Sequence, residues 1–257
     1  MNNEIDVTTD KFLGGELVIR QPKNGYRAGI DAVLLGTAAS TIHANDIVEL
    51  GCGVGTALLI TAKQRQKNNP VRKGLGIEID HIAASLALKN IVANGFGNDL
   101  QVETANGLVA NSTNENSFEL AVSNPPFFDD GNSIRAPSTT RETAYIIGAP
   151  LLVWLKAMLR LVKSNGHILL IHRADRLYDI LKALQGRAGD IRVLPIHAVE
   201  GRAANRVLIC AKKGSKAPTQ ILQGIALRAH QNDSKYLPEI DAICNGALTD
   251  IFIGLSK

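Results

Sequence analysis

Residues 49–55, Glu49-Leu50-Gly51-Cys52-Gly53-Val54-Gly55, decide the fold of this chain. They end a short apolar run, residues 46–50, and lead directly into residues 55–66, whose pattern is apolar first and polar at the end. This order predicts a buried strand, a tight turn and a helix. Glycines in such a turn let the backbone approach a ligand closely, and the start of the helix presents free N–H groups. A tight turn that binds nothing is the alternative interpretation.

The spacing of these glycines separates several kinds of nucleotide site. A dinucleotide fingerprint has the pattern G-x-G-x-x-G, but here the third glycine comes one residue early and Thr56 follows it. The Gly-Lys-Ser/Thr of a Walker-type phosphate loop is absent from this turn. The pattern E-x-G-x-G-x-G resembles the cofactor loop of class I S-adenosylmethionine-dependent methyltransferases. That resemblance implies S-adenosyl-L-methionine as cofactor, bound by Glu49, Gly51, Cys52, Gly53 and Gly55.

Strand-like runs alternate with helical patterns over most of the chain. Strands are predicted at residues 46–50, 74–79, 100–104, 118–123, 167–172, 191–198 and 206–212, and helices at 55–66, 81–93, 151–162 and 175–185. This alternation predicts an α/β fold with helices on both faces of a seven-stranded, mostly parallel sheet. The link between the predicted strands at residues 191–198 and 206–212 is too short for a parallel crossover, so the last strand should be antiparallel. The fold expected is the Rossmann-like class I methyltransferase fold.

The domain organisation follows from the same pattern. We expect an N-terminal segment at residues 1–45 that caps the cofactor pocket and a methyltransferase domain at residues 46–215. Residues 216–257 should form a C-terminal extension packed on the same domain.

Two further strand ends carry candidate cofactor residues. Glu78 and Ile79 end the second strand, where nucleoside-binding α/β folds use an acidic side chain to accept hydrogen bonds from ribose hydroxyls. Asp80 should be the N-cap of the next helix. Asn106 and Gly107 follow the third strand, and methyltransferases often have Asp at the first of these positions to hold the adenine amine. Asn can make the same hydrogen bond through its side-chain oxygen.

The fourth strand ends in Ser123-Asn124-Pro125-Pro126-Phe127-Phe128. A double proline cannot continue a strand ladder, so the chain must turn there, at the edge where such sheets bind ligands. One interpretation is a rigid turn with an aromatic anchor. The other is a catalytic motif, because the segment resembles the Asn-Pro-Pro-Tyr/Phe motif of methyltransferases acting on planar amide or aryl amine nitrogens.

That resemblance assigns catalysis to Asn124, Pro125, Pro126 and Phe127, and adds Asn124 to the cofactor-binding residues. The lone pair of an exocyclic adenine amine is delocalised into the ring, so the amine is a poor nucleophile. The Asn124 side-chain oxygen and the Pro125 carbonyl can accept both amine hydrogens, which frees the lone pair and stabilises the charge that develops on nitrogen. Phe127, and with it Phe128, can stack on a base that is splayed out of its helix.

Positive charge is concentrated after this motif. The whole chain has a net charge of +4, whereas residues 131–216 contain 15 basic and 5 acidic side chains, and 9 of the basic ones are Arg. Arginine suits bidentate phosphate contacts, which favours RNA as a partner over a merely solvated surface. Arg141, Arg202 and Arg206 are the candidate phosphate contacts.

The wider pattern resembles one family. Residues 21–35, Gln-Pro-Lys-Asn-Gly-Tyr-Arg-Ala-Gly-Ile-Asp-Ala-Val-Leu-Leu, together with the two motifs above and Arg141-Glu142-Thr143-Ala144-Tyr145, are similar to the bacterial tRNA(Val) adenine-N6 methyltransferases. The similarity covers about residues 10–215. It implies methylation of the N6 amine of the tRNA adenine just 3′ of the anticodon, with Arg27, Gly29 and Asp31 closing the cofactor pocket. Asp31 is otherwise explained as a helix-start residue, and Arg141 as a surface arginine.

Three other functions stay open at this point. A glutamine N5-methyltransferase acting on a translation factor uses the same tetrapeptide. Such enzymes have a separate helical domain ahead of the sheet, and the roughly fifty residues before Gly51 are too few to form one. An adenine-N6 methyltransferase of ribosomal RNA fits the same residues. A non-enzymatic RNA-binding protein would not need the intact glycines and Asn124.

Composition sets the remaining expectations. The 257 residues are 45% hydrophobic, with no apolar run as long as a membrane-spanning helix and no secretory signal at the N-terminus. Three cysteines that stand far apart give neither a disulfide framework nor a zinc site, and no histidine pair has metal-ligand spacing. We therefore expect a cytoplasmic protein without membrane or metal partners, of undetermined oligomeric state.

Overall fold

The computed structural model describes residues 6–25, 27–109, 114–126 and 151–247. Its main sheet has nine strands. They are β3 (Asp46–Leu50), β4 (Lys73–Glu78), β5 (Leu100–Thr104), β6 (Phe118–Ser123), β7 (Val162–Arg173), β8 (Ala188–Val199), β9 (Arg206–Lys213), β10 (Gln220–Ile221) and β11 (Ile225–Arg228). The helices are α1 (Ile30–Thr41), α2 (Thr56–Arg65), α3 (His81–Ala93), α5 (Leu151–Leu161), α6 (Leu177–Leu184) and α7 (Pro238–Cys244). A separate hairpin joins β1 (Val7–Phe12) to β2 (Leu17–Pro22).

Local sequence explains the central elements. All five residues of β3 are buried, as expected for a strand that is covered on both faces. Helix α3 begins where Asp80 accepts hydrogen bonds from the backbone N–H groups of Ile82 and Ala83, which confirms the predicted N-cap. It ends before Gly95, which has a φ of +81° that favours glycine.

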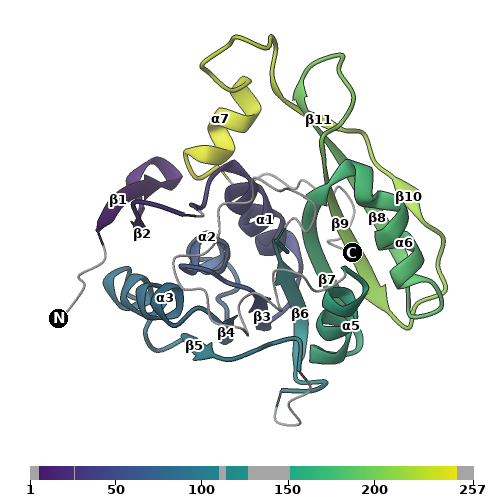
Figure 1. The fold of residues 1–257 in the computed structure, drawn as a ribbon, viewed down its shortest axis with the longest axis horizontal. Coiled ribbons are helices and arrows are strands. Elements are labelled where there is room, and N and C mark those ends of the chain that lie inside the picture. The colour runs from purple at the N-terminus through teal and green to yellow at the C-terminus, as the bar shows by residue number, and fades with distance from the viewer. Residues whose placement is uncertain (1–5, 26, 110–113, 127–150, 248–257) are drawn as a thin grey trace.

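The sheet has the order β10-β8-β9-β7-β6-β3-β4-β5, with β11 also paired to β8 (Figure 1). Neighbouring strands from β5 to β7 are parallel, and β9 is antiparallel to both β7 and β8. This arrangement confirms the predicted mostly parallel sheet with an antiparallel strand near its end. The carboxyl ends of β3, β4, β5, β6 and β7 therefore share one edge of the sheet.

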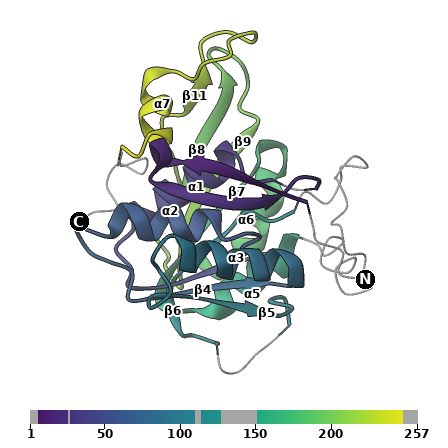
Figure 2. The ribbon, with the colours of Figure 1, turned by 90° about the vertical axis from the view of Figure 1, so that its left-hand side faces the viewer.

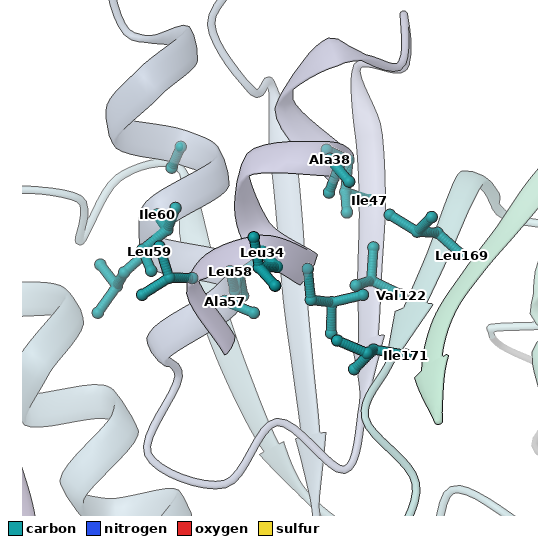
Figure 3. Packing of buried hydrophobic residues seen from close by; sticks show 14 of the residues in the cluster. Leu34, Ala38, Ile47, Ala57, Leu58, Leu59, Ile60, Val122, Leu169 and Ile171 are labelled. Atoms are coloured by element: carbon teal, nitrogen blue, oxygen red, sulfur yellow. The ribbon is translucent and has the colours of Figure 1, made fainter. Parts of the chain in front are cut away.

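Two apolar clusters cover the faces of this sheet. Side chains of α1, α2 and α3 pack on one face, and those of α5 and α6 pack on the other. Adjacent residues of a strand belong to different clusters, as Leu169 and Leu170 of β7 do. Figure 3 shows the first cluster, with Leu34 of α1 lying between α2 and the sheet.

A glycine sets how closely α1 and α2 approach. A Cβ atom on Gly36 would lie 2.7 Å from the carbonyl oxygen of Ala57 and 2.8 Å from the Cβ of Ile60. No side chain fits in that space, so the two helices can touch through their backbones. This contact holds α1 against the helix that follows the glycine loop.

The main sheet has nine strands, so the predicted number of seven is wrong. The extra strands β10 and β11 have two and four residues, too short to show a period, and both pair in parallel with β8. The hairpin β1–β2 and helices α1 and α7 were not predicted either. Nine of the twelve residues of α1 are buried, so the helix has no polar face to reveal its period. The division at residues 45 and 215 stays a prediction.

The hairpin β1–β2 packs on α3, and it lies nearest the viewer in Figure 2. The side-chain amides of Asn90 and Asn94 pair with the backbone of β2 as a neighbouring strand would. Asn90 accepts from the N–H of Arg20 at 2.9 Å and donates to its carbonyl at 3.0 Å, and Asn94 does the same for Val18 at 3.0 and 2.9 Å. Asn90 also donates to the carbonyl of Val54 at 3.0 Å, so one buried amide ties the hairpin to the glycine loop.

Neither membrane nor metal features are found in the described ranges. None of their helices combines the length and apolarity needed to cross a bilayer. The same residues contain no group of three or more His, Cys, Asp or Glu side chains placed to bind a metal ion.

Candidate active site at the carboxyl edge of the sheet

The glycine loop folds back on the second strand. Gly51 and Cys52 both donate backbone hydrogen bonds to the carbonyl of Ile77, at 2.8 and 3.2 Å, and Gly55 donates to the carbonyl of Cys52 at 2.8 Å. The glycines have φ values of +70°, +54° and +82° along the loop, a region that side chains rarely adopt. The conformation of the turn therefore explains why glycine stands at all of these positions.

The three glycines face different surroundings. A Cβ on Gly51 would lie 3.0 Å from the ring of Trp154, and one on Gly55 would lie 3.4 Å from the Cβ of Ala87. A Cβ on Gly53 would meet nothing within 4 Å. A side chain on Gly51 would crowd Trp154, one on Gly55 would make only ordinary contact with Ala87, and Gly53 is the glycine that leaves open space for a ligand.

Asn124 joins the glycine loop in lining one cavity. The cavity has a volume of about 40 Å³, which accommodates a small group rather than a whole nucleoside. Its lining comes from the loop, α1, α2, the end of β3, and the residues just before α1 and just after β6: Ala28, Ala32, Leu35, Glu49, Gly51, Cys52, Gly53, Val54, Thr56, Ala57 and Asn124. The structure therefore brings together the two motifs that sequence analysis assigned separately. Pro125 and Pro126 follow Asn124, whereas Phe127, Phe128 and Arg141 lie outside the described residues.

Glu78 is bound to the loop in this structure. One carboxylate oxygen accepts the N–H of Gly53 at 2.8 Å and the other accepts the N–H of Asp80 at 2.9 Å. Burial raises the pKa of Glu78, while these two N–H groups oppose that shift. The ribose-binding role of Glu78 stays a prediction, and it requires these oxygens to accept ribose hydroxyls in addition to the two backbone N–H groups. The cofactor-binding role of Ile79 also stays a prediction.

Asn106 and Gly107 lie after β5, beside the ends of β3 and β4. The Asn106 side-chain oxygen accepts the N–H of Leu108 at 3.0 Å. A Cβ on Gly107 would lie 2.2 Å from the Leu50 side chain and 3.1 Å from that of Ile77, so any side chain there would displace Leu50. The adenine-binding role of Asn106 stays a prediction.

The N-terminal candidates contact the protein rather than the cavity. Arg27 pairs with Asp10 of β1 at 2.6 Å and donates to the hydroxyl of Thr8 at 2.6 Å. Gly29 is the N-cap of α1. Asp31, one residue into α1, pairs with Arg206 of β9 at 3.3 Å. The neighbouring Ala28 and Ala32 line the cavity instead, and the pocket-closing role of these three positions stays a prediction.

Sequence reasoning missed most of the apolar cavity lining. Ala28, Ala32, Leu35 and Ala57 are small or aliphatic residues that carry no chemical signal. The one usable clue was their position, since Ala28 and Ala32 belong to the segment around Arg27 on which the family resemblance rests.

The Cys52 thiol is buried in the loop. Its sulfur lies where a Cβ on Gly76 would come within 2.6 Å, so the thiol fills the space left by that glycine. Burial raises the pKa of Cys52, which keeps it a neutral thiol and disfavours a redox role.

Glu49 is a buried carboxyl group in the cavity wall. It accepts the backbone N–H of Leu58 at 2.9 Å, and burial raises its pKa to about 8 from an ordinary value of 4.5. The folded state thus keeps a proton that the unfolded state releases. This contribution to stability is greatest below pH 4.5 and is lost as the pH rises toward 8.

We therefore expect Glu49→Gln to raise the melting temperature more at pH 8 than at pH 5. Each unit of pKa difference corresponds to about 1.4 kcal/mol, and Gln can still accept the Leu58 N–H while it cannot ionise. Calorimetric melts of both proteins at the two pH values measure this difference. Equal gains at pH 5 and pH 8 would contradict the burial argument.

Comparison with known proteins places this site in context. The family model described as methyltransferase small domain matches residues 29–141. A Porphyromonas gingivalis protein named tRNA1(Val) (adenine(37)-N6)-methyltransferase is 32% identical over 199 residues, which cover 73% of this chain and 76% of that protein. A Haemophilus influenzae protein of the same name is 30% identical over 62% of this chain, and the match spans only 66% of the relative's length.

Solved structures share the fold. A predicted O-methyltransferase from Agrobacterium tumefaciens has a TM-score of 0.67 at 21% identity, over 84% of this chain and 96% of that one. A 16S rRNA N2 G1207 methyltransferase from T. thermophilus has a TM-score of 0.56 at 16% identity, over 81% and 50% of the two chains. The fold is thus the Rossmann-like class I methyltransferase fold, and the chain belongs to the family of the tRNA1(Val) (adenine(37)-N6)-methyltransferases.

Proposed function

We propose that this protein transfers a methyl group from S-adenosyl-L-methionine to the exocyclic N6 amine of an adenine in tRNA, and that the target is the anticodon-loop adenine of tRNA(Val). The observation that carries the proposal is the shared cavity of Asn124 and the glycine loop. Family membership supports the reaction and the substrate class. When bound, S-adenosylmethionine supplies an electrophilic methyl group on a sulfonium.

The residues present suit this cofactor. The open space over Gly53 permits close approach of a ligand to the backbone. Among the described residues, Glu49 pairs with no cationic side chain, and an ionised carboxylate in this cavity wall would favour a positively charged ligand. Gly51, Gly53 and Glu78 would hold the cofactor at the ends of β3 and β4.

Asn124 has the chemistry that an adenine amine requires. Its side-chain oxygen and the carbonyl of Pro125 would accept the two amine hydrogens, which turns the nitrogen lone pair toward the methyl group. The same oxygens stabilise the positive charge that nitrogen gains. The amine proton leaves after transfer, so no general base is needed before it.

The assay for this function uses the purified chain, labelled S-adenosylmethionine and separate tRNA, rRNA and protein fractions. The expected product is N6-methyladenosine in tRNA, identified by nucleoside mass spectrometry and mapped to tRNA(Val). If the label appears preferentially in rRNA or in a protein glutamine, the substrate is that alternative and not tRNA. If no fraction is methylated, the proposed reaction is wrong and the non-enzymatic RNA-binding protein is the interpretation that remains.

Ion pairs among the described residues bear on which basic side chains are available for an RNA phosphate. Many basic side chains in residues 151–216 are held in ion pairs by acidic neighbours: Arg160 by Glu115, Lys163 by Asp46, Arg173 by Asp175, Arg176 by Asp179, Arg192 by Asp190 and Arg206 by Asp31. Arg202 is exposed, and within the described part of the chain it takes part in no ion pair. It lies in the β8–β9 turn, at the same sheet edge as Asn124, because the start of β9 pairs with the end of β7.

We expect Arg202→Ala to weaken tRNA binding and to reduce its salt dependence. Each phosphate contact contributes about 0.7 to 0.9 to the slope of log affinity against log salt, so the variant should lose roughly one such increment. Lys89→Ala, an exposed cation on α3, is the matched control and should leave the slope unchanged. Filter binding over a series of salt concentrations measures both, and a slope that is the same in all three proteins would rule out an Arg202–phosphate contact.

A further inference from the structure

The backbone pairing between β3 and β6 stops just before the candidate site. Its register joins Ile47, Val48 and Glu49 to Leu120, Ala121 and Val122. Beyond the last pair, the hydroxyl of Ser123 donates to the carbonyl of Leu50 at 2.7 Å. A side chain thus continues the connection between the two strands at the point where their ladder ends.

Trp154 of α5 fixes the orientation of this hydroxyl. Its indole N–H donates to the Ser123 oxygen at 2.7 Å, and both side chains are buried. Because a hydroxyl has a single proton, accepting from Trp154 leaves that proton directed at the Leu50 carbonyl. The same indole ring fills the space beside Gly51, where a Cβ would lie 3.0 Å from it.

These contacts adjoin both halves of the site. Leu50 immediately precedes Gly51 of the cofactor loop, and Ser123 immediately precedes Asn124. Methyl transfer depends on the distance and alignment between the methyl donor and the acceptor amine, and a misplacement of about 1 Å can cost a hundredfold in rate. Buried neutral hydrogen bonds are stiff, since little water competes for them.

We propose that Ser123 and Trp154 are positioning residues, which set the separation between the glycine loop and Asn124. The proposal rests on the function proposed above and adds two residues that do not line the cavity shared by Asn124 and the glycine loop. Trp154 acts through Ser123, and Ser123 acts through the backbone on each side of it. Their removal should change the rate of the chemical step more than the binding of either reactant.

The kinetic test uses Ser123→Ala, Trp154→Phe and the double variant. Trp154→Phe keeps an aromatic side chain but loses both the N–H donor and the outer ring atoms that lie beside Gly51. We expect Ser123→Ala to lower kcat about tenfold or more, with the KM values for cofactor and RNA changed less than threefold. Because the indole acts through the hydroxyl, the double variant should be no slower than Ser123→Ala.

Thr61→Val is the matched control. Thr61 is also a buried hydroxyl that donates to backbone carbonyls, of Ala57 at 2.8 Å and Gly36 at 3.1 Å, but it lies between α1 and α2. It should lower stability to a similar extent while leaving kcat unchanged. If kcat falls in proportion to the loss of melting temperature in both Thr61→Val and Ser123→Ala, the positioning role is overturned. It is also overturned if the effects of Ser123→Ala and Trp154→Phe on kcat multiply in the double variant.

A second readout needs no acceptor and separates this proposal from the proposed function. The NMR signal of the Asn124 side-chain amide, identified by its loss in Asn124→Ala, reports the position of that group directly. It should shift in Ser123→Ala and Trp154→Phe but not in Thr61→Val. The chain has a single tryptophan, so its one indole N–H resonance should move in Ser123→Ala as well. An unmoved Asn124 signal would refute positioning, whereas a wild type that methylates no RNA would refute only the proposed function.

Discussion

Replacing Asn124 with alanine should lower the rate of methyl transfer by a factor of about a hundred to a thousand, the usual loss when one preorganised charge-stabilising group is removed. The lone pair of the adenine amine stays delocalised without an acceptor for its hydrogens. The Pro125 carbonyl alone cannot hold both hydrogens. Single-turnover measurements with saturating enzyme isolate this step from product release.

Cofactor affinity distinguishes this result from a damaged pocket. Asn124 follows β6 and would face the acceptor amine rather than the methionine part of the cofactor, so the dissociation constant for S-adenosylmethionine should stay within a few-fold of wild type. Calorimetric titration measures it. Near-normal turnover in Asn124→Ala would mean that the amine-acceptor mechanism is wrong, and a large loss of cofactor affinity would instead assign Asn124 chiefly to the cofactor.

The parts of the site that could be predicted are those encoded by neighbours in the sequence. The glycine loop follows an apolar run and precedes a helix, and Asp80 stands directly before the first residue of α3. Asn124 follows a buried strand and precedes two prolines. Since parallel strands end at one edge of a sheet, these local signals were enough to predict that the motifs meet.

The parts that could not be predicted depend on residues far apart in the chain. Asp31 and Arg206 were assigned to cofactor and RNA separately, yet they pair with each other across 175 residues. Trp154 lies in the helix that was expected at residues 151–162, but its contacts with Ser123 and Gly51 depend on where α5 packs. Periodicity describes one element at a time, so it cannot report such pairings.

The glycines of the loop illustrate the same limit. The sequence suggests one role for all three alternating glycines, whereas the structure shows that their surroundings differ. Of the three loop glycines, Gly53 alone combines a positive φ, of +54°, with open space where a side chain would project. Its N–H also donates to the Glu78 carboxylate, so Gly53 links the two groups of candidate cofactor residues, the glycine loop and the end of β4. A side chain at this position must occupy the space that a ligand bound to the loop would use.

Gly53→Val should therefore abolish S-adenosylmethionine binding, with a loss of at least about a hundredfold that calorimetric titration measures, as expected for a clash within a close-packed site. Backbone strain is the competing explanation, because valine disfavours a positive φ. Gly186→Val controls for it: Gly186 has a φ of +72°, its Cβ also meets nothing within 4 Å, and it follows α6, far along the sheet. Both variants should lower the melting temperature similarly, while only Gly53→Val loses the cofactor. Binding that survives Gly53→Val at wild-type strength would remove the glycine loop from the cofactor site.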